Sequence, residues 1–368
     1  MDKDDDAGRD ELRMRRLVET ITADLALDLQ GLTVYTEAAS GPYLFTPLMA
    51  AYAGARVIAL ARDSTYAPAS LVETRTHEAA KRLGLSDQIK VVKQKLEEDV
   101  SSADIITNSG FVRPIDASMV EWMKETAVIP LMWESWEFRQ EDLDLDACKR
   151  KGVLVLGTVE SKPPVDMRPY AGLLAMKLLF ELGLEGHKTK VAVLGGQPGL
   201  GLSIVEHLGR AGCVVGWFAS VASPGITAAY SELARHWHED GDLYDAILVA
   251  EHEDDTLLLG EGGYLTFEML AQANPAVRVG VIAGNVDEPQ LATSQLRYEP
   301  KLIRPFGYMS YQPHELGPRP VLELYGGGLK VGEAMARARL NGKGPREAAV
   351  EALSLSPAMD LVGDDAWT

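Results

Sequence analysis

The stretch GGQPGLG, at positions 195–201, contains glycines whose spacing suits a chemical task. An apolar strand pattern precedes it and an amphipathic helix pattern follows, an arrangement in which glycines admit a pyrophosphate to a helix N-terminus. Gly195, Gly199 and Gly201 fit a variant of the dinucleotide fingerprint, although Pro198 stands where a G-x-G-x-x-G run has its second glycine. We predict a dinucleotide-binding turn; the alternative is a turn that only packs the helix on the strand.

The next predicted strand ends in FAS, and its last residue bears on the cofactor. Enzymes that use NAD usually place Asp or Glu here, on the ribose hydroxyls, whereas this chain has Ser220. No Arg or Lys in the following VASPGITAAY could pair with the 2′-phosphate of NADP. The sequence therefore predicts a nicotinamide cofactor, NAD or NADP, without choosing between them. The predicted cofactor-binding residues are Gly195, Gly196, Gln197, Gly199, Leu200, Gly201, Ser220 and Ala250.

Two histidines stand where a general acid or base would be useful. His252, in VAEHEDD, follows a predicted strand, and the neighbouring Glu251 and Glu253 would raise its basicity. His314 and Glu315, in YMSYQPHELGPRP, follow the last predicted strand of the chain. The competing interpretations are an exposed histidine in an acidic loop and a structural turn rich in Tyr and Pro.

Substrate-binding candidates lie at the carboxyl ends of the predicted parallel strands, where ligands bind in this kind of sheet. The stretch MWESWEFR is unusual, because Trp133 and Trp136 could flank a flat ligand while Glu134 or Arg139 fixes its polar edge. The alternative is that the aromatic rings cap the core and the charges face water. The predicted substrate-binding residues are Glu37, Ser40, Asn108, Glu134, Trp136, Arg139, Tyr308 and Arg319.

Several other kinds of site lack support in the sequence. His236 and His238 are two residues apart on a predicted helix, so they face different sides, and the two cysteines form no CxxC pair. The motifs HExxH, GxSxG and GxxxxGK[ST] do not occur. We therefore predict no metal site, serine nucleophile or P-loop.

The net charge and the apolar runs of the sequence limit which kinds of partner the protein can bind. A formal net charge of −18 argues against nucleic acid, which requires a basic footprint. The acidic start, MDKDDDAGRDELRMRR, does not resemble a signal peptide, and no apolar run is long enough to span a membrane. We expect a cytoplasmic protein with a small-molecule substrate and no membrane partner.

At 368 residues the chain is long enough for two domains. Apolar strand patterns alternate with helix patterns along it, which predicts an α/β protein made of two tandem Rossmann-like, doubly wound parallel-sheet domains with an interdomain cleft. The strands expected in the second domain include KVAVLGG, CVVGWFAS, YDAILVAEH, RVGVIAG and LIRPFGY. The predicted divisions are an acidic tail at 1–12, a substrate domain at 13–160, a dinucleotide-binding domain at 161–327, a helix at 328–340 that packs back on the first domain, and a tail at 341–368.

Three segments resemble the D-isomer-specific 2-hydroxyacid dehydrogenases of the formate/glycerate dehydrogenase type, and S-adenosylhomocysteine hydrolase, which shares their two-domain plan. DLDLDACKRKGVLVLGT resembles the dehydrogenase segment D-x-x-D-x-x-A-x-x-x-G-I-x-V, and VIAGNVDEPQL lies where that family has N-x-x-R-G-x-x-V-D-x-x-x-L. GLTVYTEAASGPYLFTPLMAAYAGARVIA resembles the first β-α-β unit of the hydrolase. The resemblance implies the two-domain fold, a nicotinamide cofactor and a homodimer.

The chain departs from the dehydrogenase pattern at two catalytic positions. The family arginine that polarises the substrate carbonyl falls near Asn285, and the place of the catalytic histidine holds Phe306. A divergent member with a different acid/base relay is therefore expected. The predicted catalytic residues are His252, His314, Glu315 and Asn285.

These patterns leave three functions open. The first is an NAD(P)-dependent oxidoreductase that acts by hydride transfer on a small polar or nucleoside-like substrate. The second is a hydrolase or lyase that uses tightly bound NAD without net redox change. The third is a ligand-binding relic of the fold that does not catalyse.

Overall fold

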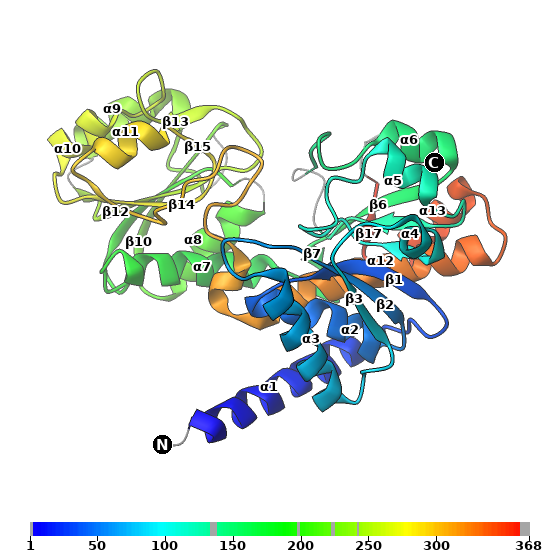
Figure 1. Cartoon of the computed structure of the whole chain (residues 1–368). Coiled ribbons are helices and arrows are strands. Elements are labelled where there is room, and N and C mark those ends of the chain that lie inside the picture. The colour runs from blue at the N-terminus through cyan, green and yellow to red at the C-terminus, as the bar shows by residue number, and fades with distance from the viewer. Residues whose placement is uncertain (1–2, 133–137, 197–198, 222–224, 241–242, 361–368) are drawn as a thin grey trace. The chain divides into compact units, whose positions relative to one another are not determined.

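The chain folds into two compact units (Figure 1). Unit 1 comprises Met1–Asp166 and Gly317–Thr368, and unit 2 is Met167–Leu316. Each unit has its own sheet and helices, which confirms the predicted α/β class with two Rossmann-like layers. Among the described residues no helix is long and apolar enough to cross a membrane. The computed structural model describes residues 3–132, 138–196, 199–221, 225–240 and 243–360.

The strands of the unit 1 sheet are β1 (Thr33–Ala38), β2 (Arg56–Ala61), β3 (Ile89–Val92), β4 (Ile105–Ile106), β5 (Val128–Pro130), β6 (Leu154–Thr158) and β17 (Ala358–Met359). They lie in the order β17-β6-β5-β4-β1-β2-β3, and all pairs are parallel except β17 with β6. β4, β5 and β6 are buried throughout, as expected for parallel strands covered on both faces. A short hairpin, β7 (Ser161–Lys162) and β8 (Val165–Asp166), ends the first part of the unit.

The helices of unit 1 are α1 (Lys3–Asp24), η1 (Gly41–Phe45), α2 (Thr46–Tyr52), α3 (Ala69–Leu83), α4 (Glu97–Ser102), α5 (Ala117–Trp122), α6 (Leu145–Lys151), α12 (Pro318–Leu340) and α13 (Pro345–Leu355). α12 packs on β5 and β6 and also contacts α1 and α2. It lies close to the sheet because glycines face it: a Cβ on Gly332 would come within 2.9 Å of side-chain atoms of Ile105 and Pro130.

The structure differs from the prediction at the boundaries of the domains. The helix expected at 328–340 begins at Pro318, since the YGGG run does not interrupt it. The segment 1–12 is not a separate tail, because α1 begins at Lys3 and buries Leu17 and Ile21 farther along. The segment 341–368 is not a tail either, because α13 packs on α12 and β17 pairs with β6. The first part of unit 1 ends at Asp166 rather than at residue 160.

The strands of the unit 2 sheet are β9 (Lys190–Leu194), β10 (Val214–Ala219), β11 (Ala228–Ala229), β12 (Ala246–Ala250), β14 (Arg278–Ala283) and β16 (Arg297–Glu299). All are parallel, in the order β11-β10-β9-β12-β14-β16. Numbered along the chain within this sheet, the order is 3-2-1-4-5-6, which is that of dinucleotide-binding domains. The strand order reverses between β9 and β12, and we call this place the switch point.

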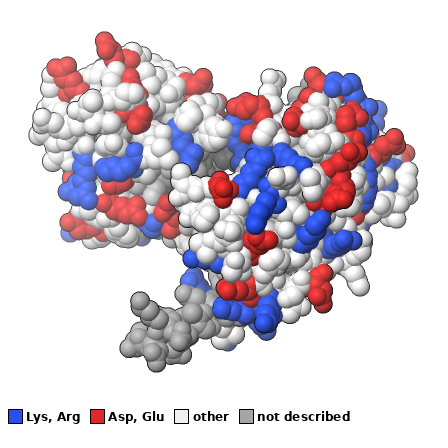
Figure 2. Space-filling model, viewed as in Figure 1, with Lys and Arg blue, Asp and Glu red and all other residues white. Residues whose placement is uncertain are grey.

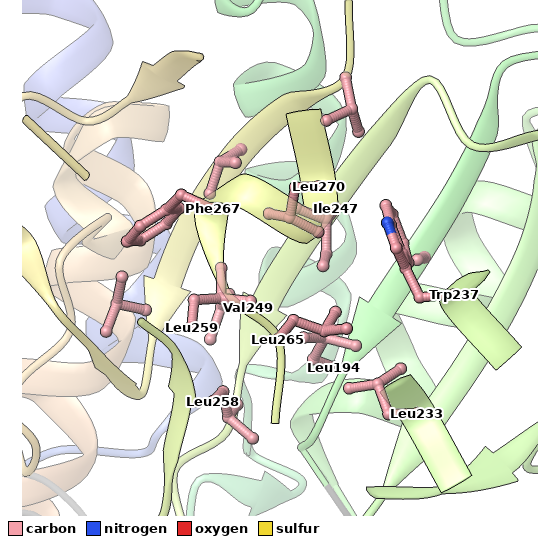
Figure 3. Packing of buried hydrophobic residues seen from close by; sticks show 14 of the residues in the cluster. Leu194, Leu233, Trp237, Ile247, Val249, Leu258, Leu259, Leu265, Phe267 and Leu270 are labelled. Atoms are coloured by element: carbon pink, nitrogen blue, oxygen red, sulfur yellow. The ribbon is translucent and has the colours of Figure 1, made fainter. Parts of the chain in front are cut away.

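Helices cover both faces of the unit 2 sheet. They are α7 (Arg168–Glu181), α8 (Leu200–Arg210), α9 (Tyr230–Asp240), α10 (Phe267–Ala273), α11 (Glu288–Thr293) and the short η4 (Pro313–Leu316). Alternate residues of β9 enter different cores: Val191 and Val193 pack with α7 and α8, whereas Ala192 and Leu194 pack with α9 and α10. This period of two is that of a strand buried on both faces. Figure 3 shows the second of these cores, in which Trp237 and Leu233 of α9 lie beside Leu194.

One predicted strand is wrong. The segment LIRPFGY, residues 302–308, forms no strand; the last strand of the sheet is β16, which ends just before Pro300. Pro300 and Pro305 lack the N–H groups that the hydrogen bonds of a sheet require, and Leu302 is 61% exposed. The apolar residues of this segment therefore do not form a buried strand. Only Met309, beyond the segment, makes an isolated bridge to Ala283.

We expect the core around Trp237 to dominate the stability of unit 2. Trp237 is 1% exposed and stacks on Tyr244 with ring centroids 5.5 Å apart. Replacing it, Trp237→Ala, should lower the free energy of unfolding by about 3–5 kcal/mol, because it leaves a large cavity. The measurement is chemical denaturation, with the exposed neighbour His238→Ala as the control. Equal effects of the two substitutions would contradict the expectation.

Candidate functional site

The turn between β9 and α8 lies at the switch point of unit 2. Gly195 has φ +88°, a left-handed conformation that L side chains rarely adopt. A Cβ on Gly195 would lie 2.5 Å from the Cβ and 2.6 Å from the Cα of Glu251, which follows β12. The ends of β9 and β12 therefore come together in a way that only glycine permits.

The start of α8 is pressed equally close to the turn. The N–H of Gly201 donates to the carbonyl of Gly196 at 2.5 Å, and a Cβ on Gly201 would collide with the carbonyl oxygen of Gly195. Gly199, at the N-cap of α8, differs from these glycines because a Cβ there would meet none of the described residues within 4 Å.

β10 braces the turn from the other side. The indole N–H of Trp217 donates to the carbonyl of Gly195 at 2.9 Å, and the N–H of Gly195 donates to the carbonyl of Phe218 at 2.7 Å. Ser220 follows β10 and is exposed, while Ala250 at the end of β12 is fully buried. The predicted cofactor residue Gln197, with Pro198, lies outside the described residues.

Glu251 is a residue whose own role the sequence analysis missed. Its side chain is 3% exposed, and its carboxylate accepts the hydroxyl of Tyr230 at 2.6 Å and the N–H of Glu253 at 2.9 Å. Burial, and next the Glu251 carboxylate, raise the pKa of Tyr230, which keeps that hydroxyl protonated as a donor. The available sequence signal was its position directly after a fully apolar strand.

His252 lies beside Glu251 at the end of β12. It is 7% exposed, so it is not the exposed histidine of the competing interpretation. Its Nε2 atom lies 3.4 Å from a carboxylate oxygen of Glu253. The structure therefore places an imidazole at the switch point, one residue away from the side chain that touches the turn.

Asn285 holds the loop that follows β12. Its amide donates to the backbone carbonyl of Asp255 at 3.0 Å and to the carboxylate of Asp255 at 3.2 Å. It lies on β15 (Asn285–Val286), which pairs with β13 (Leu257–Leu259). These contacts position the loop and leave the amide engaged with Asp255.

His314 and Glu315 lie on η4 and meet α7 of the same unit. Glu315 pairs with Lys177 at 3.2 Å, and Lys177 pairs with Glu181 at 2.8 Å. The hydroxyl of Tyr311 donates to Glu181 at 2.7 Å. Burial lowers the pKa of His314, and the Lys177 charge acts in the same direction, while the Glu315 carboxylate opposes them.

In unit 1, polar side chains gather at the carboxyl ends of β1 and β4. The Glu37 carboxylate is 7% exposed and accepts the N–H of Phe111 at 3.0 Å; burial raises its pKa, against the opposing effects of that hydrogen bond and of Arg113. The Asn108 side-chain carbonyl accepts the N–H of Met132 at 3.0 Å. Buried hydroxyls lie nearby in a connected group: Thr36, Thr107, Ser109 and Tyr325.

The remaining substrate candidates are not brought into one group. Arg139 donates to Asp142 at 2.9 Å, and Arg113 donates to the same carboxylate at 2.8 Å. Ser40 precedes η1 without capping it, and Arg319 pairs with Glu323 along α12. Tyr308 lies in the segment after β16, in unit 2. Glu134 and Trp136 lie outside the described residues. In the part of the chain that is described, no group of three or more His, Cys, Asp or Glu residues could hold a metal ion.

Comparisons with known proteins locate the fold. No family model matches the sequence, and no curated protein matches it. The solved structure of dipicolinate synthase from Bacillus subtilis is 12% identical over 85% of this chain and 99% of its own, with a TM-score of 0.55. The dipicolinate synthase structure from Bacillus halodurans has the same identity and coverage, with a TM-score of 0.52. A 2-hydroxyacid dehydrogenase from Ketogulonicigenium vulgare is 12% identical over 85% of this chain and 96% of its own, with a TM-score of 0.46.

At these identities the likeness concerns the fold. The two dipicolinate synthase structures confirm the predicted fold, an α/β chain with two Rossmann-like domains, and the resemblance to the 2-hydroxyacid dehydrogenases in sequence stays a prediction. The second likeness, to S-adenosylhomocysteine hydrolase, stays a prediction.

We expect His314 to titrate below its ordinary pKa of about 6.5. Glu315→Gln should lower the pKa further, because it removes the charge that favours the imidazolium, and Lys177→Gln should raise it. Because the folded chain binds this proton less tightly than the unfolded chain does, the contribution of His314 to stability should fall as the pH decreases from 6.5 toward the lowered value. NMR titration of the ring in the wild type and in both variants measures this; a ring pKa at or above 6.5, or identical curves in all three proteins, would contradict it.

Glu37 should make folding less favourable as the pH rises above the ordinary glutamate value, because its folded pKa is raised and the unfolded chain loses the proton first. Glu37→Gln keeps an acceptor for the Phe111 N–H and removes the charge, so stability should then vary less with pH. Denaturation across the pH range measures this, with Glu98→Gln on the exposed face of α4 as the control. A pH slope that Glu37→Gln leaves unchanged is the contrary result.

Proposed function

We propose that the chain is an NAD(P)-dependent oxidoreductase that binds its cofactor at the 195–201 turn of unit 2 and transfers hydride to or from a small polar or nucleoside-like substrate. The observation that carries this proposal is the position of the turn, at the place where the order of the unit 2 strands reverses. In open α/β sheets, ligands bind beyond the carboxyl ends of the strands at such a switch point.

The residues present fit a pyrophosphate. Gly195 and Gly201 allow β9, the turn and α8 to pack without side chains between them. α8 is an eleven-residue helix whose N-terminus offers backbone N–H groups and the positive end of its dipole to an anion. The open space at Gly199 is where a phosphate can approach the backbone.

The residue expected to contact the ribose of the dinucleotide favours neither NAD nor NADP. Ser220 is exposed after β10 and can donate or accept a hydrogen bond, but it offers neither the carboxylate that selects NAD nor the cation that selects NADP. This supports binding of both dinucleotides with modest discrimination.

The nicotinamide supplies the hydride chemistry when bound, and the chain supplies orientation and proton transfer. In this proposal His252 is the acid or base, because it follows Glu251, whose side chain lies against the turn. Asn285 acts as a positioning residue through its bonds to Asp255. His314, with Glu315, is the second candidate for the acid or base. Glu37 and Asn108 are the proposed polar contacts for the substrate in unit 1.

The proposed cofactor-binding site at the 195–201 turn is tested by adding one negative charge there. Gly199→Asp places a carboxylate at the N-terminus of α8, which should weaken NADH and NADPH binding by about tenfold or more, since like charges at this range repel by a kcal/mol or more. Gly209→Asp is the matched control, because a Cβ there also meets nothing within 4 Å and it lies near the other end of α8. Isothermal titration calorimetry measures both.

Failure of the wild-type protein to bind either dinucleotide, or equal binding by Gly199→Asp, would overturn the proposal. Turnover on a substrate without added cofactor would instead favour the alternative in which NAD is held tightly and no net redox change occurs.

A further inference from the structure

A concave site lies in unit 1, and none of its lining residues is among those predicted to bind substrate or cofactor. It is an open pocket of about 500 Å³ at the carboxyl end of β2, where Lys93, just after β3, and the first turn of α3 also border it. Ligands bind beyond the carboxyl ends of parallel strands, so the pocket is at the functional edge of this sheet. Its lining residues are Ala61, Arg62, Asp63, Ala69, Ser70 and Lys93.

The cations of the pocket have unused hydrogen-bond donors. Arg62 is exposed, and within the described ranges its guanidinium pairs with no carboxylate or carbonyl. Lys93 pairs with Glu73 at 2.6 Å, which leaves further donors on its ammonium group. The acidic member, Asp63, accepts the N–H of Ala69 at 2.7 Å and so caps the start of α3.

A third cation stands close by. Lys95 donates to the carbonyl of Pro114 at 2.5 Å. Burial, and next the charge of Arg62, lower the pKa of Lys95 to about 8, and Asp116 opposes this. The charge of Arg62 therefore disfavours the charged form of Lys95 in the free protein, and an anion bound beside Arg62 would oppose this effect. Figure 2 shows blue Lys and Arg groups among the acidic ones on unit 1, although the whole chain carries a charge of −18.

The start of α3 adds donors to the same place. α3 has fifteen residues, and its N-cap, Pro68, provides no side-chain cap. Ser70, in the first turn, lines the pocket with its hydroxyl-bearing side chain. Helix N-termini attract anions through their N–H groups and dipole. Together with the two cations, the pocket presents more donors than the two oxygens of a carboxylate require.

We propose that this pocket binds the dianionic phosphate group of a small phosphate monoester, held by Arg62, Lys93 and Ser70. Arginine matches phosphate with two parallel hydrogen bonds, and the lysine and hydroxyl groups can take the third terminal oxygen. The pocket is formed by residues of unit 1, whereas the proposed cofactor-binding turn is formed by residues of unit 2. The chain would thus recognise a phosphorylated molecule, either its substrate or an effector, in addition to the dinucleotide.

The test is calorimetric titration of the full chain with glycerol 3-phosphate, inorganic phosphate and acetate. Glycerol 3-phosphate should bind with saturation and acetate should not. Arg62→Gln should weaken binding by about tenfold or more, because it removes a charge-assisted bidentate pair. Arg75→Gln, an exposed arginine farther along α3, is the matched control and should bind as the wild type does. Thermal midpoints of both variants should equal that of the wild type.

The Gly199→Asp variant separates this site from the cofactor seat. Retained phosphate binding in Gly199→Asp supports the pocket, whereas loss of binding there assigns the phosphate to the glycine turn and overturns the proposal. The proposal also fails if the wild type shows no saturable binding of glycerol 3-phosphate, if Arg62→Gln binds it unchanged, or if only inorganic phosphate binds. Dinucleotide binding is measured in a separate titration. The phosphate titration can therefore be interpreted even if the cofactor proposal fails.

Discussion

The close contact between the ends of β9 and β12 constrains the rest of the candidate site. At Gly195 the backbone of the turn lies against the backbone and side chain of Glu251, at distances that exclude any Cβ. The carboxylate of Glu251 is then fixed by the Tyr230 hydroxyl and by the N–H of Glu253. The turn, the end of β12 and the loop that carries His252 therefore form one rigid arrangement. A change at Gly195 would move all three, because interiors packed this closely respond to added volume by shifting backbone.

The same contact puts a buried acid beside a proposed anion seat. A carboxylate a few ångströms from a phosphate repels it by a few kcal/mol at an effective dielectric constant of about 20. The N-terminus of α8 offsets only about 0.3–1 kcal/mol of this by its dipole, so the dipole alone does not decide the balance. The donors that face Glu251, from Tyr230 and Glu253, also reduce the field that a ligand would meet. An anion bound at the proposed site would therefore depend on direct N–H contacts from the start of α8 near Gly199.

The sequence patterns predicted the elements that local chemistry determines. Apolar runs such as VAVL and AILVA are unbroken because parallel strands are buried on both faces, and the β9 and β12 strands follow them closely. The patterns failed where tertiary contacts override local preference. Glycine disfavours helices, yet α12 continues through YGGG because its glycines let it approach the sheet at Ile105 and Pro130. In LIRPFGY the apolar residues suggested a strand, but Pro305 lacks an N–H donor and Leu302 is exposed. Glu251 was predicted only as a neighbour of His252, because no sequence pattern shows that its side chain meets a glycine turn some fifty residues earlier.

The residues at positions 285 and 306 limit how a proton relay could work in this chain. An arginine at position 285 would present a positive charge to the ligand. The amide of Asn285 instead donates hydrogen bonds to the carbonyl and carboxylate of Asp255. That residue thus stabilises the loop after β12 and leaves charge and proton transfer to other side chains. Phe306 lies in a segment without a strand and offers no titratable group. If hydride transfer takes place here, its proton must come from a group near the switch point, and the loop that Asn285 holds contains one in His252.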